Sequence, residues 1–307
     1  METNTSPRMP YHVAALLEEA IQLLDIKSDG TYIDATFGGG GHSRAIIKLL
    51  GKEGRLFGFD RDLDARANAI NDDRFFFVHG NFRHIENFLR FYNVGKVDGI
   101  LADFGVSFHH FDSPERGFSF RNESHLDMRM NQLAKTTAAG FIEEANEETL
   151  NKILRAYTDL KKPGLVAKAI ARAKEEEPIH TTTRLAEVVR SVIDPRQEKK
   201  ELAQVFQAFR IAINHEAEDL EIFLNTTLRV LKPGGRLVTL TYHSMEDRMV
   251  KNFLRSGNIE GKEDKDFFGN VNTKWELITR KPIEASAEEI GRNPRARSAK
   301  LRAAILK

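Results

Sequence analysis

The chain has 307 residues, 41% of them hydrophobic, and a formal charge of +1, which suits one large domain or two modest ones. So small a net charge excludes a global basic field, and any nucleic-acid site must be a local patch. The sequence has no cysteine, which excludes disulfides, thiolate metal sites and cysteine nucleophiles. No apolar run approaches transmembrane length, so we expect a soluble, cytoplasmic protein that does not bind membranes.

The first third of the chain alternates between predicted helices and strands. An amphipathic helix is expected at 13–24, because its apolar residues recur at helical spacing. Strands are then expected at 31–33, 55–60, 75–78 and 97–103, with helices at 43–50, 62–70 and 85–92. This alternation predicts a parallel sheet with right-handed crossovers. Ligands of such sheets bind beyond the carboxyl ends of the strands, so we expect the strand ends to share one site.

Four consecutive glycines, Gly38–Gly41, separate the first strand from a helix that His42 and Ser43 open. Glycine lets a backbone approach a ligand closely, and a helix N-terminus offers unpaired N–H groups. A glycine cluster alone is a weak signal, since a plain flexible turn has the same composition. Asp60 ends the second strand about 20 positions later, where an acidic side chain meets a ribose in doubly wound nucleotide folds.

Two nucleotide-binding folds compete for this pattern. The dehydrogenase pattern G-x-G-x-x-G/A would put its third small residue at Ser43, and serine fits poorly where a helix packs closely on a strand. Asp34 precedes the glycines, and its carboxylate would repel a pyrophosphate but suit the ammonium group of S-adenosylmethionine (SAM). The sequence therefore favours SAM over a nicotinamide cofactor. Phe82, after the third strand, is either an adenine contact or ordinary core.

Asp103 ends the fourth strand, beside the expected methyl donor. Amino methyltransferases commonly carry an Asp/Asn-Pro-Pro-aromatic tetrapeptide here, and this chain has Asp103-Phe-Gly-Val106, which keeps the acceptor without the prolines. An acceptor at this place can hold an exocyclic amine for in-line attack on the methyl group. It can equally bind only the amino group of the cofactor, and the sequence leaves both roles open.

The alternation stops after the fourth strand. Residues 112–200 contain no good strand candidate, and helices are expected at 138–145, 148–157, 164–175 and 183–192. We predict an inserted helical substrate-recognition domain at 112–200, between two parts of a methyltransferase domain at 1–111 and 201–307. Helices at 205–212 and 217–231 precede strands at 236–242, 275–279 and 301–306, and a charged stretch at 256–272 predicts a mobile loop.

Several Arg and Phe residues are candidates for RNA contact. Arg116, Phe118 and Phe120 share one short motif and Arg129 lies in the next, and such residues suit phosphate contact and base stacking. A hydrophobic plug between two domains would use the same residues. His243 follows the fifth strand of the sheet, where it is either a site residue or a hydrogen-bonded structural histidine.

The stretch from Arg292 to Arg302 holds five cations and no acid, which predicts a local patch for a phosphate backbone. Arg295 and Arg297 are its central candidates. No His/Asp/Glu cluster has convincing metal spacing, so no metal is predicted.

Eight motifs, in order from about His12 to Arg302, strongly resemble the bacterial small-subunit ribosomal RNA cytosine-N4 methyltransferases, the RsmH or MraW family. They are Asp34-Ala-Thr-Phe-Gly-Gly-Gly-Gly-His-Ser43, Phe59-Asp-Arg-Asp62, Val97-Asp-Gly-Ile-Leu101, Arg116-Gly-Phe-Ser-Phe120, Leu126-Asp-Met-Arg-Met130, Phe206-Gln-Ala-Phe-Arg-Ile211, His243-Ser-Met-Glu-Asp-Arg248 and Asn293-Pro-Arg-Ala-Arg-Ser298. The resemblance implies an α/β fold, a class I SAM-methyltransferase Rossmann-like sheet with an inserted all-α domain. It also implies methylation of the N4 amine of a cytosine in 16S rRNA, in the decoding region (P site) of the assembled small subunit.

By this resemblance several residues match the family's cofactor positions: Gly40, Gly41, His42, Asp60, Phe82 and Asp103. His110 stands where the family usually has Gln, Glu201-Leu-Ala-Gln-Val-Phe206 replaces a run that usually contains Arg, and Ala14 replaces a Pro. By the same resemblance, Arg210 is expected to contact the RNA substrate. The departures near the site motivate a second hypothesis, a non-catalytic SAM-sensing or ribosome-assembly factor. A homodimer is one expected oligomeric form.

Overall fold

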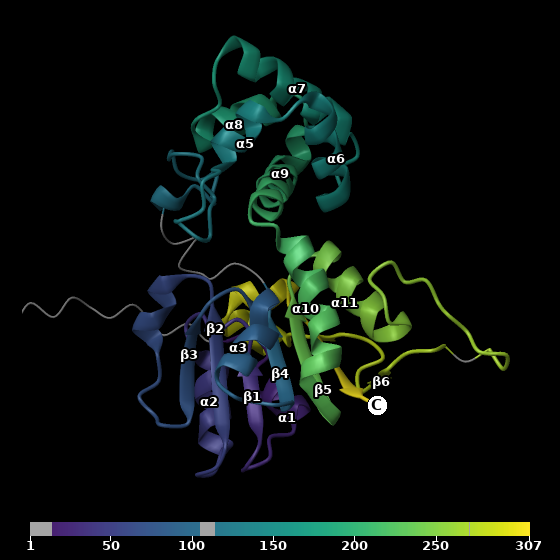
Figure 1. The fold of residues 1–307 in the computed structure, drawn as a ribbon. Coiled ribbons are helices and arrows are strands. Elements are labelled where there is room, and N and C mark those ends of the chain that lie inside the picture. Colours follow the sequence, from purple (N-terminus) through teal and green to yellow (C-terminus); the bar gives the residue numbers. More distant parts are fainter. Residues whose placement is uncertain (1–13, 105–113, 270) are drawn as a thin grey trace, which may run out of the picture. The chain divides into compact units, whose positions relative to one another are not determined.

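The computed structural model describes residues 14–104, 114–269 and 271–307 (Figure 1). The chain divides into two compact units, with the divisions after Gly105 and after Leu220. The first unit contains the chain before and after the insertion and is built on a single sheet, whereas the described part of the second unit is helical.

The sheet of the first unit has the strand order β3-β2-β1-β4-β5-β8-β6, with β7 paired to β8. Pairs among the first five strands of this order are parallel, and β8 is antiparallel to its three neighbours. The strands are β1 (Thr31–Asp34), β2 (Arg55–Asp60), β3 (Phe75–His79), β4 (Val97–Asp103), β5 (Leu231–Thr241), β6 (Trp275–Leu277), β7 (Ile283–Glu284) and β8 (Lys300–Leu306). The predicted α/β class and parallel core of the sheet are confirmed.

The centre of this sheet is apolar because both of its faces are covered. Ile33 on β1 and Ile100 and Leu101 on β4 have no or almost no exposed surface. The α-helices of this unit are α1 (Leu17–Leu24), α2 (Gly41–Leu49), α3 (Ile85–Phe91), α11 (Ser244–Ser256) and α12 (Ala287–Arg292), and α10 (Glu216–Val230) crosses the division. Its 3-10 helices are η1 (Leu63–Asn68), η2 (Phe82–His84) and η5 (Pro294–Ser298).

The predicted turn at 232–235 lies inside β5 rather than before it. Leu231 already pairs with Val97, and the register then shifts so that Arg236 pairs with Gly99. Gly234, with a φ of 78°, allows the extra residues to bulge out of the sheet. The strand therefore begins earlier than its hydrophobic run at 236–242 indicates.

The second unit is a helical bundle whose helices bury one apolar face each. Its elements are η3 (Pro114–Arg116), α5 (Ala138–Glu144), α6 (Glu147–Tyr157), α7 (Pro163–Glu176), α8 (Thr182–Arg190), η4 (Pro195–Gln197) and α9 (Glu198–Ile213). Thr137, Asn146 and Thr181 cap α5, α6 and α8, because each side chain accepts a hydrogen bond from an N–H of the first turn.

The boundary predicted at residue 200 needs a correction. Leu202, Val205, Phe206 and Phe209 on α9 belong to the hydrophobic core of the helical unit. The helical unit therefore keeps the whole of α9 and ends at Leu220. No helix in the described part of the chain is long and apolar enough to span a membrane.

Candidate active site

Four polar side chains lie at the carboxyl ends of neighbouring strands in the first unit. Asp34 ends β1, Asp60 ends β2, Asp103 ends β4 and Tyr242 follows β5 directly. These strands are adjacent in the order β2-β1-β4-β5 and run in parallel (Figure 1). The sheet therefore gathers three carboxylates and a phenol at one edge, as the sequence predicted for Asp60 and Asp103.

Asp60 and the glycine turn are held together by the backbone. One carboxylate oxygen of Asp60 accepts the N–H of Gly38 at 2.8 Å, and the other accepts the N–H of Asp62 at 2.8 Å. Burial nevertheless raises the pKa of Asp60. Because an ionised carboxylate has about four acceptor positions, Asp60 retains capacity for a ligand hydroxyl.

Close packing explains the second half of the glycine run. A Cβ on Gly40 would lie 2.9 Å from the Phe37 ring, and one on Gly41 would lie 2.9 Å from Cβ of Ala14. Gly40 also has a φ of 74°, which favours glycine. A Cβ on Gly39, in contrast, would meet no atom within 4 Å. The turn is thus packed against the protein on one side and open at Gly39.

The buried Asp34 side chain is hydrogen-bonded to residues on both sides of the glycine turn. Its side chain is 1% exposed and accepts hydrogen bonds from the Thr36 N–H at 3.1 Å and the Ser43 hydroxyl at 2.7 Å. Burial raises the pKa of Asp34 to about 6. Ser43 is itself fully buried, and its hydroxyl explains why serine is suitable at the helix start. Because the Asp34 side chain is almost completely enclosed, its carboxylate braces the turn, and the contact with the SAM ammonium group that the sequence predicted for it is not supported.

Asp103 is the least satisfied carboxylate of the edge. Its N–H donates to the Thr36 hydroxyl oxygen at 2.6 Å, which fixes the backbone, and its side chain is 22% exposed. The Tyr242 hydroxyl hydrogen-bonds to the Asp103 carboxyl group, whereas Asp103 Oδ1 is buried without a partner. Burial, together with the charges of Asp34 and Glu246, raises the pKa of Asp103 to about 7.

His42 faces Asp103 as a neutral ring. Its Nε2 lies 3.2 Å from the carbonyl oxygen of Ala15, so this nitrogen carries the proton and donates it. Nδ1 is then the unprotonated nitrogen, and it lies 3.8 Å from Asp103 Oδ2. Burial lowers the pKa of His42 to about 4, which keeps the ring neutral at physiological pH.

These residues fit SAM. Its ammonium group and ribose hydroxyls need acceptors, and the edge offers the unpartnered Asp103 Oδ1 and the remaining capacity of Asp60. The open side of the turn at Gly39 leaves room for a ligand. Phe82 is half-buried and makes edge-to-face contacts with Phe104 and Phe223, at ring distances of 5.7 and 5.3 Å. His110 lies outside the described residues.

Arg116 and Arg129, predicted to contact RNA, are both engaged inside the helical unit. Arg116 is 6% exposed, and its Nη2 donates to the carbonyl oxygens of Arg129 and Met130 at 2.9 and 3.1 Å. The Arg129 guanidinium pairs with Asp127 at 2.7 Å. It also donates to the carbonyl oxygens of Gln132 and Ala134. These contacts give both guanidinium groups a structural role, which counts against a primary role in RNA binding.

The other predicted RNA residues of this unit are also packed. Phe118 belongs to the helical core, and Phe120 packs against that core with its ring 5.5 Å from that of Phe206. Arg210 is 8% exposed and forms a two-pronged pair with Glu216, at 2.8 and 2.9 Å. Their positions support the alternative reading of this region as packing.

The predicted basic stretch of the first unit divides into two groups. Arg295 and Arg297 are exposed on η5. Arg302 is buried and pairs with Asp247 at 2.7 Å, and Lys300 lies 3.6 Å from the same carboxylate. The sequence window contains no acid, but α11 supplies one, so only part of the stretch is available as a patch.

His243 also has a partner. Its Nε2 lies 2.8 Å from Glu246, a buried carboxylate that accepts the Tyr242 N–H at 3.1 Å through its other oxygen. These contacts support the structural reading of His243. The sequence analysis did not identify Thr36 or Tyr242 as site residues. Tyr242 could have been identified, because it directly follows β5 at the carboxyl end of the strand.

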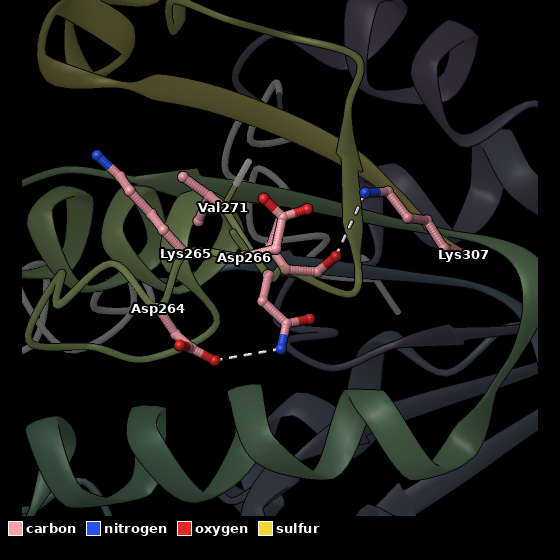
Figure 2. Close-up of a pocket in the computed structure, with 7 residues that line it drawn as sticks. Asp264, Lys265, Asp266, Val271 and Lys307 are labelled. Atoms are coloured by element: carbon pink, nitrogen blue, oxygen red, sulfur yellow. Dashed lines mark hydrogen bonds between the residues drawn. The ribbon is translucent and has the colours of Figure 1, made fainter. Parts of the chain in front are cut away.

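A cavity of about 380 Å³ lies away from these residues, between the loop after α11 and the end of the chain (Figure 2). Two hydrogen bonds frame it, from the Asn272 amide to Asp264 at 3.2 Å and from Lys307 Nζ to the Thr273 carbonyl at 3.3 Å. None of the predicted site residues lines this cavity, so it is not the expected cofactor site.

Comparison with known proteins gives the family. Residues 9–306 match the profile described as the MraW methylase family. "Ribosomal RNA small subunit methyltransferase H" of Bacteroides fragilis (strain YCH46) is 52% identical over 96% of this chain and 97% of the relative. The protein of the same name from Christiangramia forsetii is 49% identical over 96% and 98%.

Solved structures are more distant. An rRNA methylase from Streptococcus thermophilus has a TM-score of 0.42 at 9% identity, over 94% of this chain and 93% of that one, and so low a similarity adds no weight. The profile and the relatives extend over nearly the whole chain, from before the glycine turn to β8. The chain therefore belongs to the MraW methylase family.

Proposed function

We propose that this protein, a SAM-dependent methyltransferase, methylates the N4 amine of one cytosine in the decoding region of 16S rRNA, in the small ribosomal subunit. The observation that carries the chemistry is Asp103, whose Oδ1 is buried without a hydrogen-bond partner at the strand-end edge. The substrate rests on the names of the relatives, which are small-subunit ribosomal RNA methyltransferases.

Each residue of the edge has a part in this proposal. SAM supplies an electrophilic methyl group on a sulfonium. Asp60 accepts from the ribose hydroxyls, while the open side of the turn at Gly39 receives the body of the cofactor. Asp103 accepts an N–H of the target amine and aligns its nitrogen with the methyl carbon, because the amine lone pair is delocalised into the cytosine ring and needs orientation.

The proton lost from the methylated amine has an acceptor nearby. Burial raises the pKa of Asp103 to about 7, which suits a group that holds a proton transiently at neutral pH. The Tyr242 hydroxyl hydrogen-bonds to the carboxyl group, and the neutral His42 ring, 3.8 Å away, adds no positive charge. Asp103 is therefore proposed as the catalytic residue.

The second candidate is a SAM-binding protein without transfer activity. In this reading Asp103 Oδ1 accepts only from the ammonium group of the cofactor. The unpartnered oxygen supports both readings, since either nitrogen would satisfy it.

Partner, location and assembly belong to the proposal as well. The substrate form is the assembled small subunit in the cytoplasm, and the helical unit recognises it. Arg295 and Arg297 support RNA contact by the first unit, because both are exposed. A homodimer is the proposed oligomeric form.

The decisive experiment uses labelled SAM and small subunits from a strain that lacks the modification. The wild-type protein should label one cytosine, at N4, in 16S rRNA. Asp103→Asn should reduce the transfer rate at least 100-fold, about 2.7 kcal/mol or more, while an exposed control, Asp73→Asn, should not. Folded wild-type protein that binds SAM and labels no RNA would establish the non-catalytic candidate instead.

A further inference from the structure

The α6–α7 hairpin of the helical unit carries a dense positive charge. From Lys152 to Lys174, seven of 23 residues are Lys or Arg and only Asp159 is acidic. The whole chain has a formal charge of only +1, so the rest of it is net negative. This concentration is therefore a local feature of one hairpin and not a property of the chain.

Six of these cations are exposed, and we call five of them the basic face, namely Lys152, Arg155, Lys161, Lys162 and Lys168. Within the described residues, none of the five forms a salt bridge. The two cations nearer the end of α7 differ, because Arg172 pairs with Glu176 at 3.0 Å and Lys174 donates to two backbone carbonyls. The basic face is thus the part of the hairpin whose cations have no acidic partner among the described residues.

The contacts of Asn151 show where the two helices of the hairpin meet. Arg155 Nε donates to Asn151 Oδ1 at 3.1 Å, and this oxygen lies 3.5 Å from the position of a Cβ on Gly164. Arg155 on α6 is therefore near the first turn of α7, which Lys161 and Lys162 directly precede in the chain. Lys168 lies four residues after Gly164 and so on the same side of α7.

The opposite sides of both helices are buried. Leu150 and Leu154 of α6, and Val166 and Ile170 of α7, are in the core of the helical unit. Packing therefore fixes which sides face the solvent, and the cations share that solvent side. Like charges so close repel one another and cost stability, and an anionic partner would remove this cost.

We propose that the basic face binds the phosphate backbone of the RNA substrate, an inference that rests on the proposed rRNA methyltransferase function. Four of its five members are lysines, whose mobile ammonium groups act as point charges and suit phosphates without reading sequence. Such contacts position a protein on RNA, while other residues select the base. The helical unit would then recognise the substrate through this face rather than through the paired Arg116, Arg129 and Arg210.

The test compares two double variants of the full-length protein. Lys161→Ala with Lys162→Ala removes two members of the basic face. Lys199→Ala with Lys200→Ala is the matched control, because these two lysines are also adjacent, exposed and in the helical unit, but lie between Glu198 and Glu201. Binding to unmodified small subunits, and SAM-dependent methylation of them, are measured over a series of KCl concentrations.

The basic-face variant should bind more weakly at every KCl concentration, and the slope of log K against log [KCl] should fall by about two. Its KM for subunits should rise while its affinity for SAM stays at the wild-type value and its unfolding midpoint does not fall. The control should keep the wild-type slope. An equal slope in both variants would overturn the inference, as would weakened binding to polyglutamate with unchanged binding to RNA, which would indicate an acidic protein partner.

The same experiment separates this inference from the proposed function. If the wild-type protein binds subunits but does not methylate them, the proposed function fails, and the slopes still test the basic face. If it methylates them and the Lys161/Lys162 variant keeps its KM and its slope, only the basic face is excluded.

Discussion

The carboxylates of the strand-end edge and the arginines of the helical unit differ in how their charges are compensated. Asp60 and Asp103 form no ion pair with Lys or Arg in the described structure, and burial raises the pKa of each. Arg129 and Arg210 instead pair with Asp127 and Glu216 at 2.7 and 2.8 Å.

This difference distinguishes candidate ligand-binding residues from residues that stabilise the fold. A buried charge without a partner costs free energy, and proteins retain such groups mainly where function needs them. A guanidinium in an ion pair already has its partner. Its removal leaves the partner carboxylate unpaired, which costs free energy in the same way. Compensation, rather than residue type, therefore distinguishes Asp60 and Asp103 as candidates for ligand binding from the paired arginines.

The largest effect is expected at Arg210. Arg210→Ala leaves the Glu216 carboxylate, itself only 10% exposed, without its partner, and should lower the free energy of unfolding by about 3–5 kcal/mol. Urea denaturation followed by circular dichroism measures this loss. Arg172→Ala, in an exposed pair with Glu176, is the control and should cost about 0.5 kcal/mol or less. SAM affinity should stay unchanged in both, and a loss of SAM affinity at Arg210→Ala would contradict its structural role.

The second effect concerns the pH dependence of SAM binding. Burial raises the pKa of Asp103 to about 7, so the free protein holds a proton there at pH 6. A bound cation favours the ionised carboxylate, so binding below pH 7 must release that proton. SAM affinity should therefore rise roughly fivefold from pH 6 to pH 7 and roughly tenfold from pH 6 to pH 8, and level off above that. Titration calorimetry at several pH values measures this rise, and Asp103→Asn should flatten it.

The contribution of Asp103 to folding stability should change with pH in the opposite direction to SAM affinity. Because the folded pKa of Asp103 lies above the ordinary aspartate value of 3.8, its contribution to stability is present below pH 3.8 and is lost as pH rises toward 7. Without ligand, Asp103→Asn should therefore gain stability relative to the wild type between pH 4 and pH 7, on the order of 1.4 kcal/mol per unit of pKa shift. Asp34, whose pKa is raised to about 6, titrates in the same range and interacts with Asp103, so the comparison measures the titration of the pair. Parallel stability curves would show that burial does not perturb Asp103.

A smaller effect is expected at Asp60. Asp60→Ala removes the acceptor proposed for the ribose hydroxyls and should weaken SAM binding by about 1–3 kcal/mol. Asp62→Ala is the matched control, since the Asp62 side chain caps η1 by accepting the Asp64 N–H at 3.1 Å. The control should reduce stability and keep SAM affinity. Equal SAM affinity in both variants would mean that Asp60 only braces the turn.

Local patterns predicted the strand-end edge because its information is local. The hydrophobic runs of β2 and β4 end at Asp60 and Asp103, and parallel pairing then places those residues together. The same reasoning predicted a helix at 62–70, although the element there is a 3-10 helix rather than an α-helix. Periodicity also predicted the helices of the insertion.

Long-range partners could not be predicted in this way. Arg302 is satisfied by Asp247, 55 residues away, and the Met130 N–H by Asn214, 84 residues away. A window of sequence therefore showed the cations of 292–302 without their acid. The assignment of α9 to the methyltransferase domain was wrong for the same reason, because a helical pattern does not reveal which core the helix joins.

The smallest effect contrasts an exposed arginine with a paired one. Arg297 is exposed on η5, so Arg297→Ala should reduce the salt slope of binding to small subunits by about one and leave stability unchanged. Arg116→Ala should keep the wild-type salt slope and lower stability, because its guanidinium donates hydrogen bonds to the carbonyls of Arg129 and Met130. Salt titrations of both variants, with urea denaturation beside them, provide the measurement. A reduced slope for Arg116→Ala at wild-type stability would return Arg116 to the RNA surface, and compensation within the fold would then no longer separate structural from functional arginines.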